Sequence, residues 1–376
     1  MTYSLLIIKT NFNEISISTY YIYYNIFQLS TNEKSISVDI GKISSLPPET
    51  LFTSARIIPL ETTDSSLMAQ IDKVLVHKKT IYLLDARQNI VFVFNDNGNF
   101  LFKINQKGRG PEEYNFLNDI NINPYEQTLE LLDPMGNLLT FDTTGKFIAK
   151  VSLPKEIPAY HKFGYIDREH IAFCCEHNEN ILSIYSRTSG KITGKYIKNK
   201  KNCAIGLPSF YTYNDTTYLS RFLFDQVYCV SKEGPKIAYE WFIPGHDYDP
   251  LKTIPDYDRN NFQEFKEVVD NLPCTYYKNW QNQDYLYTVI QIKGKEDCIN
   301  IFYEKPTGKS TVFDKLEKEI SFVADYMDDS TAIGIIQSSE MANYQNLNIL
   351  DTFSREIIKH YDDVTSNPYL IEYIFK

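Results

Sequence analysis

The sequence lacks the features that mark a metal centre, a membrane protein or a nucleic-acid-binding protein. Its six cysteines, at positions 174, 175, 203, 229, 274 and 298, form no Cys-x-x-Cys pair or other metal-ligand spacing. The apolar runs near the N-terminus are shorter than the ~20 residues of a membrane-spanning helix. The 38 Lys and Arg residues form no basic tract against 48 Asp and Glu. We therefore expect no nucleic-acid partner, because such partners need clustered positive charge.

Catalytic signatures are also missing. No G-x-S-x-G elbow, P-loop or dinucleotide-binding fingerprint occurs in the 376 residues. The sequence therefore predicts no catalytic residue and identifies no cofactor, and it leaves room for a divalent cation such as calcium. The even cysteine count permits disulfides in an oxidising compartment, but buried free thiols are the simpler interpretation.

What the sequence does contain is a repeat, clearest in residues 71–153. Two consecutive units each hold four short runs of alternating apolar and polar residues, the pattern of half-buried strands. The glycine turns of the two units are 145 − 98 = 47 residues apart. A period of 40–50 residues with four strands per unit is typical of a propeller blade. The strands are expected at 72–77, 80–85, 90–95 and 100–104, and at 117–123, 128–133, 138–142 and 147–153.

Weaker copies extend the repeat to a six-bladed β-propeller. Three further units span 160–197, 209–243 and about 275–313, and each has a glycine at the outer turn. A sixth unit has runs at 322–326, 332–337 and 369–375 but lacks its outermost strand. We expect residues 55–60 to supply that strand beside 369–375, because joining the two chain ends closes the ring and removes open sheet edges. Helical inserts are expected within 256–272 and 347–361.

The first 50 residues do not fit the repeat. Residues 1–30 have neither the positive start of a signal peptide nor a lipid-attachment cysteine. We interpret them as a degraded export signal or a start site assigned too far upstream, with 35–53 as a linker. The expected domains are thus a lead-in at 1–50 and a propeller at 51–376.

Several runs resemble a six-bladed β-propeller family of Bacteroides-type bacteria, which is similar to NHL-repeat propellers and largely uncharacterised. The resemblance covers roughly residues 50–376 and implies an exported, often lipid-anchored protein of the periplasm or cell surface. Since no lipoprotein signal is present, membrane association is expected only if that signal was lost; a monomer is expected. The runs are Leu60-Glu61-Thr62-Thr63, Ile71-Asp72-Lys73, Ile81-Tyr82-Leu83-Leu84-Asp85, Gly108-Arg109-Gly110-Pro111-Glu112-Glu113-Tyr114 and Asn367-Pro368-Tyr369-Leu370.

The candidate ligand-binding residues lie in loops at one face of the ring. Connections between blades share that face with connections between second and third strands, and binding residues commonly lie in such loops. Arg109 is the leading candidate, because its planar guanidinium suits a carboxylate or phosphate. The alternative is that this loop clamps neighbouring blades together. The candidates are Arg109, Glu112, Glu113 and Tyr114 in the first blade-to-blade loop, and Asp85, Arg87 and Asp133 at strand ends.

Each remaining candidate has a plainer interpretation. Asp85 and Asp133 could bind a cation or sugar hydroxyls, but aspartates at strand ends more often accept hydrogen bonds from their own turns. The His-Cys-rich run 170–177 cannot converge on a metal, since strand alternation sends its side chains to opposite sides. The acidic insert holding Asp247, Asp249, Asp256 and Asp258 matches no calcium-loop pattern.

The function predicted from the sequence is therefore non-enzymatic. We expect a binding or interaction module that takes a small molecule, a glycan, a peptide or a protein at the channel mouth. The alternative is a propeller enzyme, such as a lactonase, a lyase or a glycan-active enzyme, with a metal or acid–base site in the central channel. Carboxylate, His or Asn side chains converging from three or more blades would favour the enzyme. A mouth lined by aromatic side chains and single hydrogen-bonding groups would favour binding.

Overall fold

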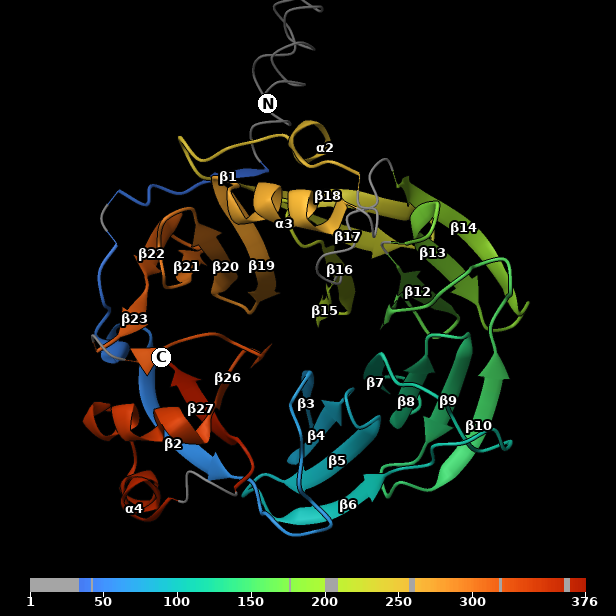
Figure 1. The fold of residues 1–376 in the computed structure, drawn as a ribbon, viewed down its shortest axis with the longest axis horizontal. Coiled ribbons are helices and arrows are strands. Elements are labelled where there is room, and N and C mark those ends of the chain that lie inside the picture. The colour runs from blue at the N-terminus through green and yellow to red at the C-terminus, as the bar shows by residue number, and fades with distance from the viewer. Residues whose placement is uncertain are drawn as a thin grey trace, which may run out of the picture.

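The computed structural model describes residues 34–41, 43–175, 177–199, 209–256, 261–317, 320–361 and 366–376. Six antiparallel sheets stand around a ring, as Figure 1 shows. From the centre outward, blades one to three are β3 (Lys73–His77), β4 (Thr80–Asp85), β5 (Ile90–Asn95) and β6 (Phe100–Ile104); β7 (Asp119–Asn123), β8 (Thr128–Asp133), β9 (Asn137–Phe141) and β10 (Phe147–Ser152); β11 (Lys162–Tyr165), β12 (His170–Cys174), β13 (Asn180–Ser186) and β14 (Lys191–Lys198). The six-bladed propeller expected from the repeat is confirmed.

The second half of the ring repeats this order, with more insertions. Blades four and five are β15 (Ser209–Tyr213), β16 (Thr216–Ser220), β17 (Gln226–Ser231) and β18 (Gly234–Phe242); and β19 (Cys274–Gln281), β20 (Tyr285–Ile292), β21 (Ile299–Glu304) and β22 (Lys309–Phe313). Blade six is β25 (Tyr326–Met327), β26 (Thr331–Ile336), β27 (Tyr369–Phe375) and β2 (Phe52–Pro59). The innermost strands β3, β7, β11, β15, β19 and β25 contact one another in sequence around the channel.

The ring closes as the sequence predicts. Strand β2 pairs antiparallel with β27 from Phe52 opposite Phe375 to Pro59 opposite Tyr369. Arg56 and Glu372, which are cross-strand partners, also form an ion pair. The outermost strand of the last blade thus comes from the start of the described chain, so blade six has no missing strand.

A separate hydrophobic core lies between each pair of neighbouring blades. Strand β4 illustrates why, because it is buried on both faces. Its Leu83 packs with blade six, while Tyr82 and Leu84 on the other face pack with blade two. Equivalent clusters join blades two and three, three and four, four and five, and five and six. A blade buries both faces only when both neighbours are present, so the folded ring stabilises every blade.

Glycine is required at the outer turn of the best-preserved blades. Gly98 has a φ of +85°, and a Cβ there would lie 2.0 Å from the carbonyl oxygen of Pro59 in the neighbouring blade. Gly145 has a φ of +84°, and a Cβ there would lie 2.5 Å from the Phe102 ring. The repeated glycine therefore serves two purposes, because it permits the left-handed backbone and the close approach of the next blade.

The structure differs from the expected elements at several points. Strand β1 (Ser35–Ser37), which the sequence pattern did not predict, pairs parallel with β18 and makes blade four five-stranded. The expected strand at 322–326 shrinks to β25, because Phe322 and Ala324 enter the core between blades five and six instead. A small hairpin, β23 (Lys315–Leu316) with β24 (Ile320–Ser321), precedes it.

The helical inserts are present with shifted bounds. The insert between blades four and five contains α2 (Pro250–Thr253) and α3 (Phe262–Asp270), and α3 buries Phe265 and Val269 against a loop of blade four. The last insert contains the 3-10 helix η3 (Ser338–Asn346) and α4 (Thr352–His360). A further 3-10 helix, η1 (Pro48–Thr50), precedes β2. No described helix is long and apolar enough to cross a bilayer. The expectations for residues 1–30 and for Asp258 lie outside the described residues.

Candidate functional site

The central channel carries a layer of mostly charged side chains, one from each blade. We call this set the lysine layer. It consists of Lys73, Asp119, Lys162, Ser209, Lys278 and Asp325, which line one cavity of about 110 Å³. Most of them stand at the first residue of an innermost strand, so the layer lies toward the face where blade-to-blade connections enter, which we call the connection face.

Ion pairs within the lysine layer join neighbouring blades. The Lys73 Nζ donates to Asp119 Oδ1 at 2.7 Å, linking blades one and two. The Lys162 Nζ lies 3.8 Å from the same oxygen, from blade three. Lys278 donates to Asp325 Oδ1, linking blades five and six. Burial lowers the pKa of Lys73, and the opposing effect of Asp119 offsets this only in part.

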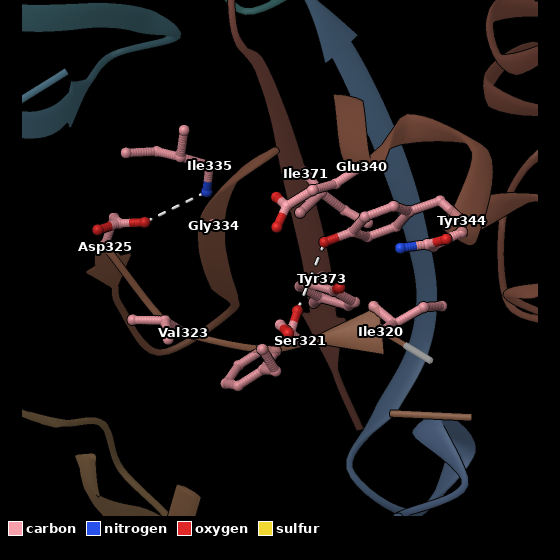
Figure 2. A pocket seen from close by; sticks show the side chains of 12 residues that line it. Ile320, Ser321, Val323, Asp325, Gly334, Ile335, Glu340, Tyr344, Ile371 and Tyr373 are labelled. Carbon is pink, nitrogen blue, oxygen red and sulfur yellow. Dashed lines mark hydrogen bonds between the residues drawn. The ribbon is translucent and has the colours of Figure 1, made fainter. Parts of the chain in front are cut away.

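Both aspartates also accept hydrogen bonds from backbone groups. Asp119 Oδ2 accepts from the Phe163 backbone N–H at 3.0 Å. Asp325 Oδ2 accepts from the Ile335 backbone N–H at 3.2 Å, which Figure 2 shows beside a smaller cavity of about 90 Å³. On the far side of that cavity, the Tyr344 hydroxyl donates to the Ser321 carbonyl. Each carboxylate is therefore fixed by a lysine and by a backbone amide.

A larger cavity opens at the opposite end of the channel. We call it the aromatic cavity. Its volume is about 350 Å³, and it lies at the face that carries the turns between first and second strands, which we call the hairpin face. Lys73, Phe210 and Trp280 line both this cavity and the lysine layer's cavity, so the two adjoin. The aromatic side chains that line it are Tyr165, Phe210, Tyr211, Tyr213, Trp280 and Tyr326.

Polar groups are distributed singly among these rings. The Trp280 Nε1 donates to the Ala324 carbonyl at 3.1 Å, which fixes the indole between blades five and six. The Lys305 Nζ lies 4.2 Å from the centre of the Tyr213 ring and donates to Gln281 Oε1 at 3.1 Å. Burial lowers the pKa of Lys305. The Asn121, Asp328 and Asp329 side chains also line the cavity.

Charges at the hairpin face stand behind the aromatic wall. The buried Glu130 accepts from both the Arg187 guanidinium and the Tyr165 hydroxyl, at 2.7 and 3.0 Å to its Oε2. Burial, followed by the charge of Glu130, raises the pKa of Tyr165 well above its ordinary value. Tyr165, which lines the cavity, is therefore a neutral residue whose hydroxyl donates to Glu130.

The loop that contains Arg109 is held by its own backbone and by Lys150. Glu113 Oε2 accepts from the Gly110 N–H at 2.6 Å, and Lys150 donates to the Glu113 carbonyl at 2.6 Å. The Tyr114 hydroxyl is buried and contacts the Asn89 and Ile104 carbonyls, and burial raises its pKa to about 12. Arg109 and Glu112 are exposed, and no described residue pairs with either side chain.

The strand-end candidates also include both buried, hydrogen-bonded residues and an exposed one. Asp85 is fully buried, and its carboxylate accepts from the backbone N–H groups of Ala69, Gln70 and Gln88. Asp133 is also buried and accepts from the Met135 N–H at 2.9 Å, within its own turn.

Arg87 is exposed and pairs with no described residue. None of the seven sequence candidates lines the lysine layer's cavity or the aromatic cavity. An open hollow at the connection face does contact their loop, through Glu112 and Glu113.

No metal-binding group forms in the described parts of the chain, where three or more His, Cys, Asp or Glu side chains nowhere gather suitably. His170 contacts Asp167, while Cys175 Sγ lies 3.4 Å from His161 Nδ1. In the acidic insert, Asp249 caps α2 by accepting from the Leu251 N–H. Cys229, Cys274 and Cys298 are free thiols, and Cys203 lies outside the described residues.

The channel residues were missed although the sequence contains a signal for them. In blades one to four, the residue that begins the innermost strand and the one two positions later both line the channel cavities, as Lys73 and Leu75 or Asp119 and Asn121 do. In blade five the equivalent pair, Lys278 and Trp280, lies four residues further into the strand. Aligning the innermost strands of all blades would have placed three lysines and two aspartates on one level.

The sequence matches the model of a domain of unknown function, DUF4934, over residues 13–370. The chain belongs to this family. None of the curated proteins matches this DUF4934 chain.

Two solved structures resemble this DUF4934 protein. One is a Bacteroides fragilis protein that is provisionally described as exported. It has 14% identity and a TM-score of 0.72 over 91% of this chain and 100% of that chain. The other is a DUF4221-family member from Bacteroides vulgatus, with 12% identity and a TM-score of 0.51 over 87% of this chain and 97% of that chain. At these identities the likeness concerns the fold alone.

Proposed function

We propose that this DUF4934 protein is a non-enzymatic binding protein that holds a saccharide in the aromatic cavity. One observation carries the proposal: a cavity of about 350 Å³ that is lined by six aromatic residues, three of them partly exposed, together with single hydrogen-bonding side chains. Ligand sites are commonly concave, mostly apolar and of this size, with a few polar groups that set orientation.

Sugar rings suit this wall because they have an apolar face and a polar edge. Trp280, Tyr213 and Tyr326 are only partly buried, so their rings are accessible from the cavity. The Asp328 and Asp329 carboxylates at the cavity offer acceptors for hydroxyl groups. The Gln281 and Asn121 side chains also line it and accept hydrogen bonds from Lys305 and Lys73. A peptide is the alternative ligand from the sequence, and it would be expected to need backbone partners along an open strand edge.

The test is binding of a saccharide array by the wild type and by cavity variants. We expect Tyr213→Ala and Trp280→Ala to weaken binding at least tenfold, or by about 1.4 kcal/mol. The matched control is Phe353→Ala, because Phe353 is an exposed aromatic residue on α4, outside the channel. The proposal would be contradicted if Phe353→Ala weakened saccharide binding as much as the cavity variants did. It would also be contradicted if the wild type bound peptides but no saccharide.

The alternative of a propeller enzyme is tested with the same ligands. Any saccharide that binds is incubated with the protein, with and without added calcium, and products are followed by mass spectrometry. Turnover that is lost in Asp328→Asn or Tyr326→Phe would favour the enzyme, since both residues line the aromatic cavity.

We also propose that the protein acts outside the cytoplasm. Support comes from its similarity in fold to the Bacteroides fragilis protein that is provisionally assigned as exported. Fractionation of cells that express the full-length gene tests this proposal, because recovery in the cytoplasm alone would contradict it.

A further inference from the structure

We infer that the lysine layer binds an anionic group, either a carboxylate or a sulfate ester, on the saccharide that the aromatic cavity holds. The inference rests on the proposed function and adds the charge class of the ligand. Its basis is the difference between what the lysines and the aspartates of this layer present to the cavity.

The lysines keep N–H groups available for a ligand. An ammonium has three donors. Among the described residues, Lys162 donates to the Asn118 carbonyl at 3.0 Å, and Lys278 donates to Asp325. No other hydrogen-bond acceptor occurs for either ammonium in the described chain, so each retains two donors. Lys73 donates to Asp119 and Asn121 and retains one.

Asp119 is withdrawn behind the lysines, and Asp325 has both of its oxygens occupied. The Asp119 side chain is 1% exposed, whereas those of Lys162 and Lys278 are 17% and 38% exposed. The Asp325 side chain is 18% exposed, but one of its oxygens accepts from Lys278. Asp119 and Asp325 each use their second oxygen on a backbone N–H of a neighbouring segment. The third carboxylate at this cavity, on Asp72, accepts from the Ala86 N–H and the Gln70 side chain. The cavity surface is therefore rich in donors although positive and negative side chains are equal in number.

The lysines also converge. The ammonium groups of Lys73 and Lys162 lie 2.7 and 3.8 Å from one oxygen of Asp119, and Lys278 lines the same cavity from across the channel. Burial lowers the pKa of Lys73, and the charge of Lys162 lowers it further. An added anion would offset both effects, because a nearby negative charge favours the protonated amine.

The position of this layer fits a ligand that extends along the channel. Phe210 and Trp280 line both cavities, so a sugar ring stacked on Trp280 would be close enough for one of its substituents to reach the lysines. A single acidic substituent on that sugar would enter the lysine layer while the remaining rings occupy the aromatic cavity.

The experiment compares matched neutral, uronate and sulfated saccharides by calorimetry and array binding. We expect the wild type to bind an acidic saccharide at least tenfold more tightly than its neutral counterpart, with the preference falling at high salt. Lys162→Met removes a charge without breaking the closest ion pairs, and it should weaken acidic binding about tenfold while leaving neutral binding unchanged. Lys146→Met, at an exposed outer turn, is the matched control.

Each outcome decides between the two proposals. Equal binding of acidic and neutral saccharides, or an unchanged preference in Lys162→Met, overturns the anionic site and leaves the proposed function intact. If the wild type binds no saccharide at all, the proposed function is overturned as well. The uronate and sulfate arms identify which anion is bound. If Lys162→Met does not fold, the double variant Lys278→Met/Asp325→Asn is used instead, because it removes both members of an ion pair. The preference for acidic saccharides is then measured in that variant, and we expect it to be lost.

Discussion

The two ends of the channel place their charged groups differently. At the connection face, the ammonium groups of Lys73, Lys162 and Lys278 form part of the cavity wall. At the hairpin face, the wall is aromatic, and the ion pair of Glu130 with Arg187 stands behind Tyr165. The same scaffold, with one innermost strand per blade, thus produces a polar end and an apolar end.

This difference indicates that the ends respond differently to substitution. Ion pairs of the lysine layer join blades one to three and blades five and six, so they contribute to ring closure as well as to any ligand site. Side chains of the aromatic cavity contribute mainly by packing and shape. The following predictions separate these roles.

The largest effect is expected at Asp119. Asp119→Ala leaves Lys73 buried without its carboxylate and removes the acceptor of the Phe163 N–H. Breaking one partner of a buried pair should lower the free energy of unfolding by about 3–5 kcal/mol. Urea denaturation measures this loss. Asp142→Ala is the comparison variant of the same blade, because it removes hydrogen bonds only within an exposed turn and should cost less. A loss below ~1 kcal/mol at Asp119 would show that the lysine layer does not stabilise the ring.

A smaller effect is expected behind the aromatic wall. Tyr165→Phe keeps the ring but removes the hydroxyl that donates to the buried Glu130 carboxylate. A hydrogen bond to a charged group contributes about 1.5–3 kcal/mol, so unfolding should become easier by that amount while saccharide binding is retained. Tyr125→Phe, whose ring faces Arg168 at the surface, should change stability by less than ~0.5 kcal/mol. Lost binding in Tyr165→Phe would instead place its hydroxyl among the ligand contacts.

The polar end should also respond to acid through His161. Burial, with the charges of His177 and Lys162, lowers the pKa of His161 to about 4, so in this range the unfolded chain takes up a proton that the folded chain does not. The free energy of unfolding should therefore decrease as pH falls from about 6.5 to about 4, by at most ~1.4 kcal/mol per pH unit. The exposure of His161 to water reduces this value.

A variant isolates this contribution from other titrating groups. His161→Gln should reduce the pH dependence in that window when its unfolding curves are subtracted from those of the wild type. Cys175, whose thiol contacts His161, remains in both proteins. An identical pH dependence in the two proteins would mean that His161 takes up its proton at the same pH in the folded and the unfolded state.

The regular part of the fold was predictable, because blades one and two preserve four alternating runs and a glycine turn that the backbone requires at Gly98 and Gly145. Strand β1 was not predictable, because three residues carry no periodic pattern and pair only where the edge of β18 is available. The pairing of β2 with β27 was predictable because the last repeat lacks one strand, and not because of any pattern within β2 itself.

The candidate site was harder to predict, for a physical reason. Both faces of every blade are buried against neighbours, so aromatic residues occur throughout the strands. Trp280, which lines the channel, and Trp241, which is buried between blades four and five, follow similar sequence patterns. Their positions separate them, because Trp280 is on the innermost strand β19 and Trp241 is on the outer strand β18. Exposed loop residues such as Arg109 are therefore more distinctive in the sequence than the channel residues are.

The smallest effect is expected at Arg109 itself. Its guanidinium is exposed and pairs with no described residue, while Glu113 beside it is held by the Gly110 N–H. Arg109→Ala should therefore change the free energy of unfolding by less than ~0.5 kcal/mol, and it should leave saccharide binding unchanged. Glu113→Ala removes the acceptor within the loop and should cost more, about 1 kcal/mol. If Arg109→Ala weakened binding more than Lys162→Met did, the ligand would contact the loop at the connection face, and the contrast between the two ends of the channel would no longer define the site.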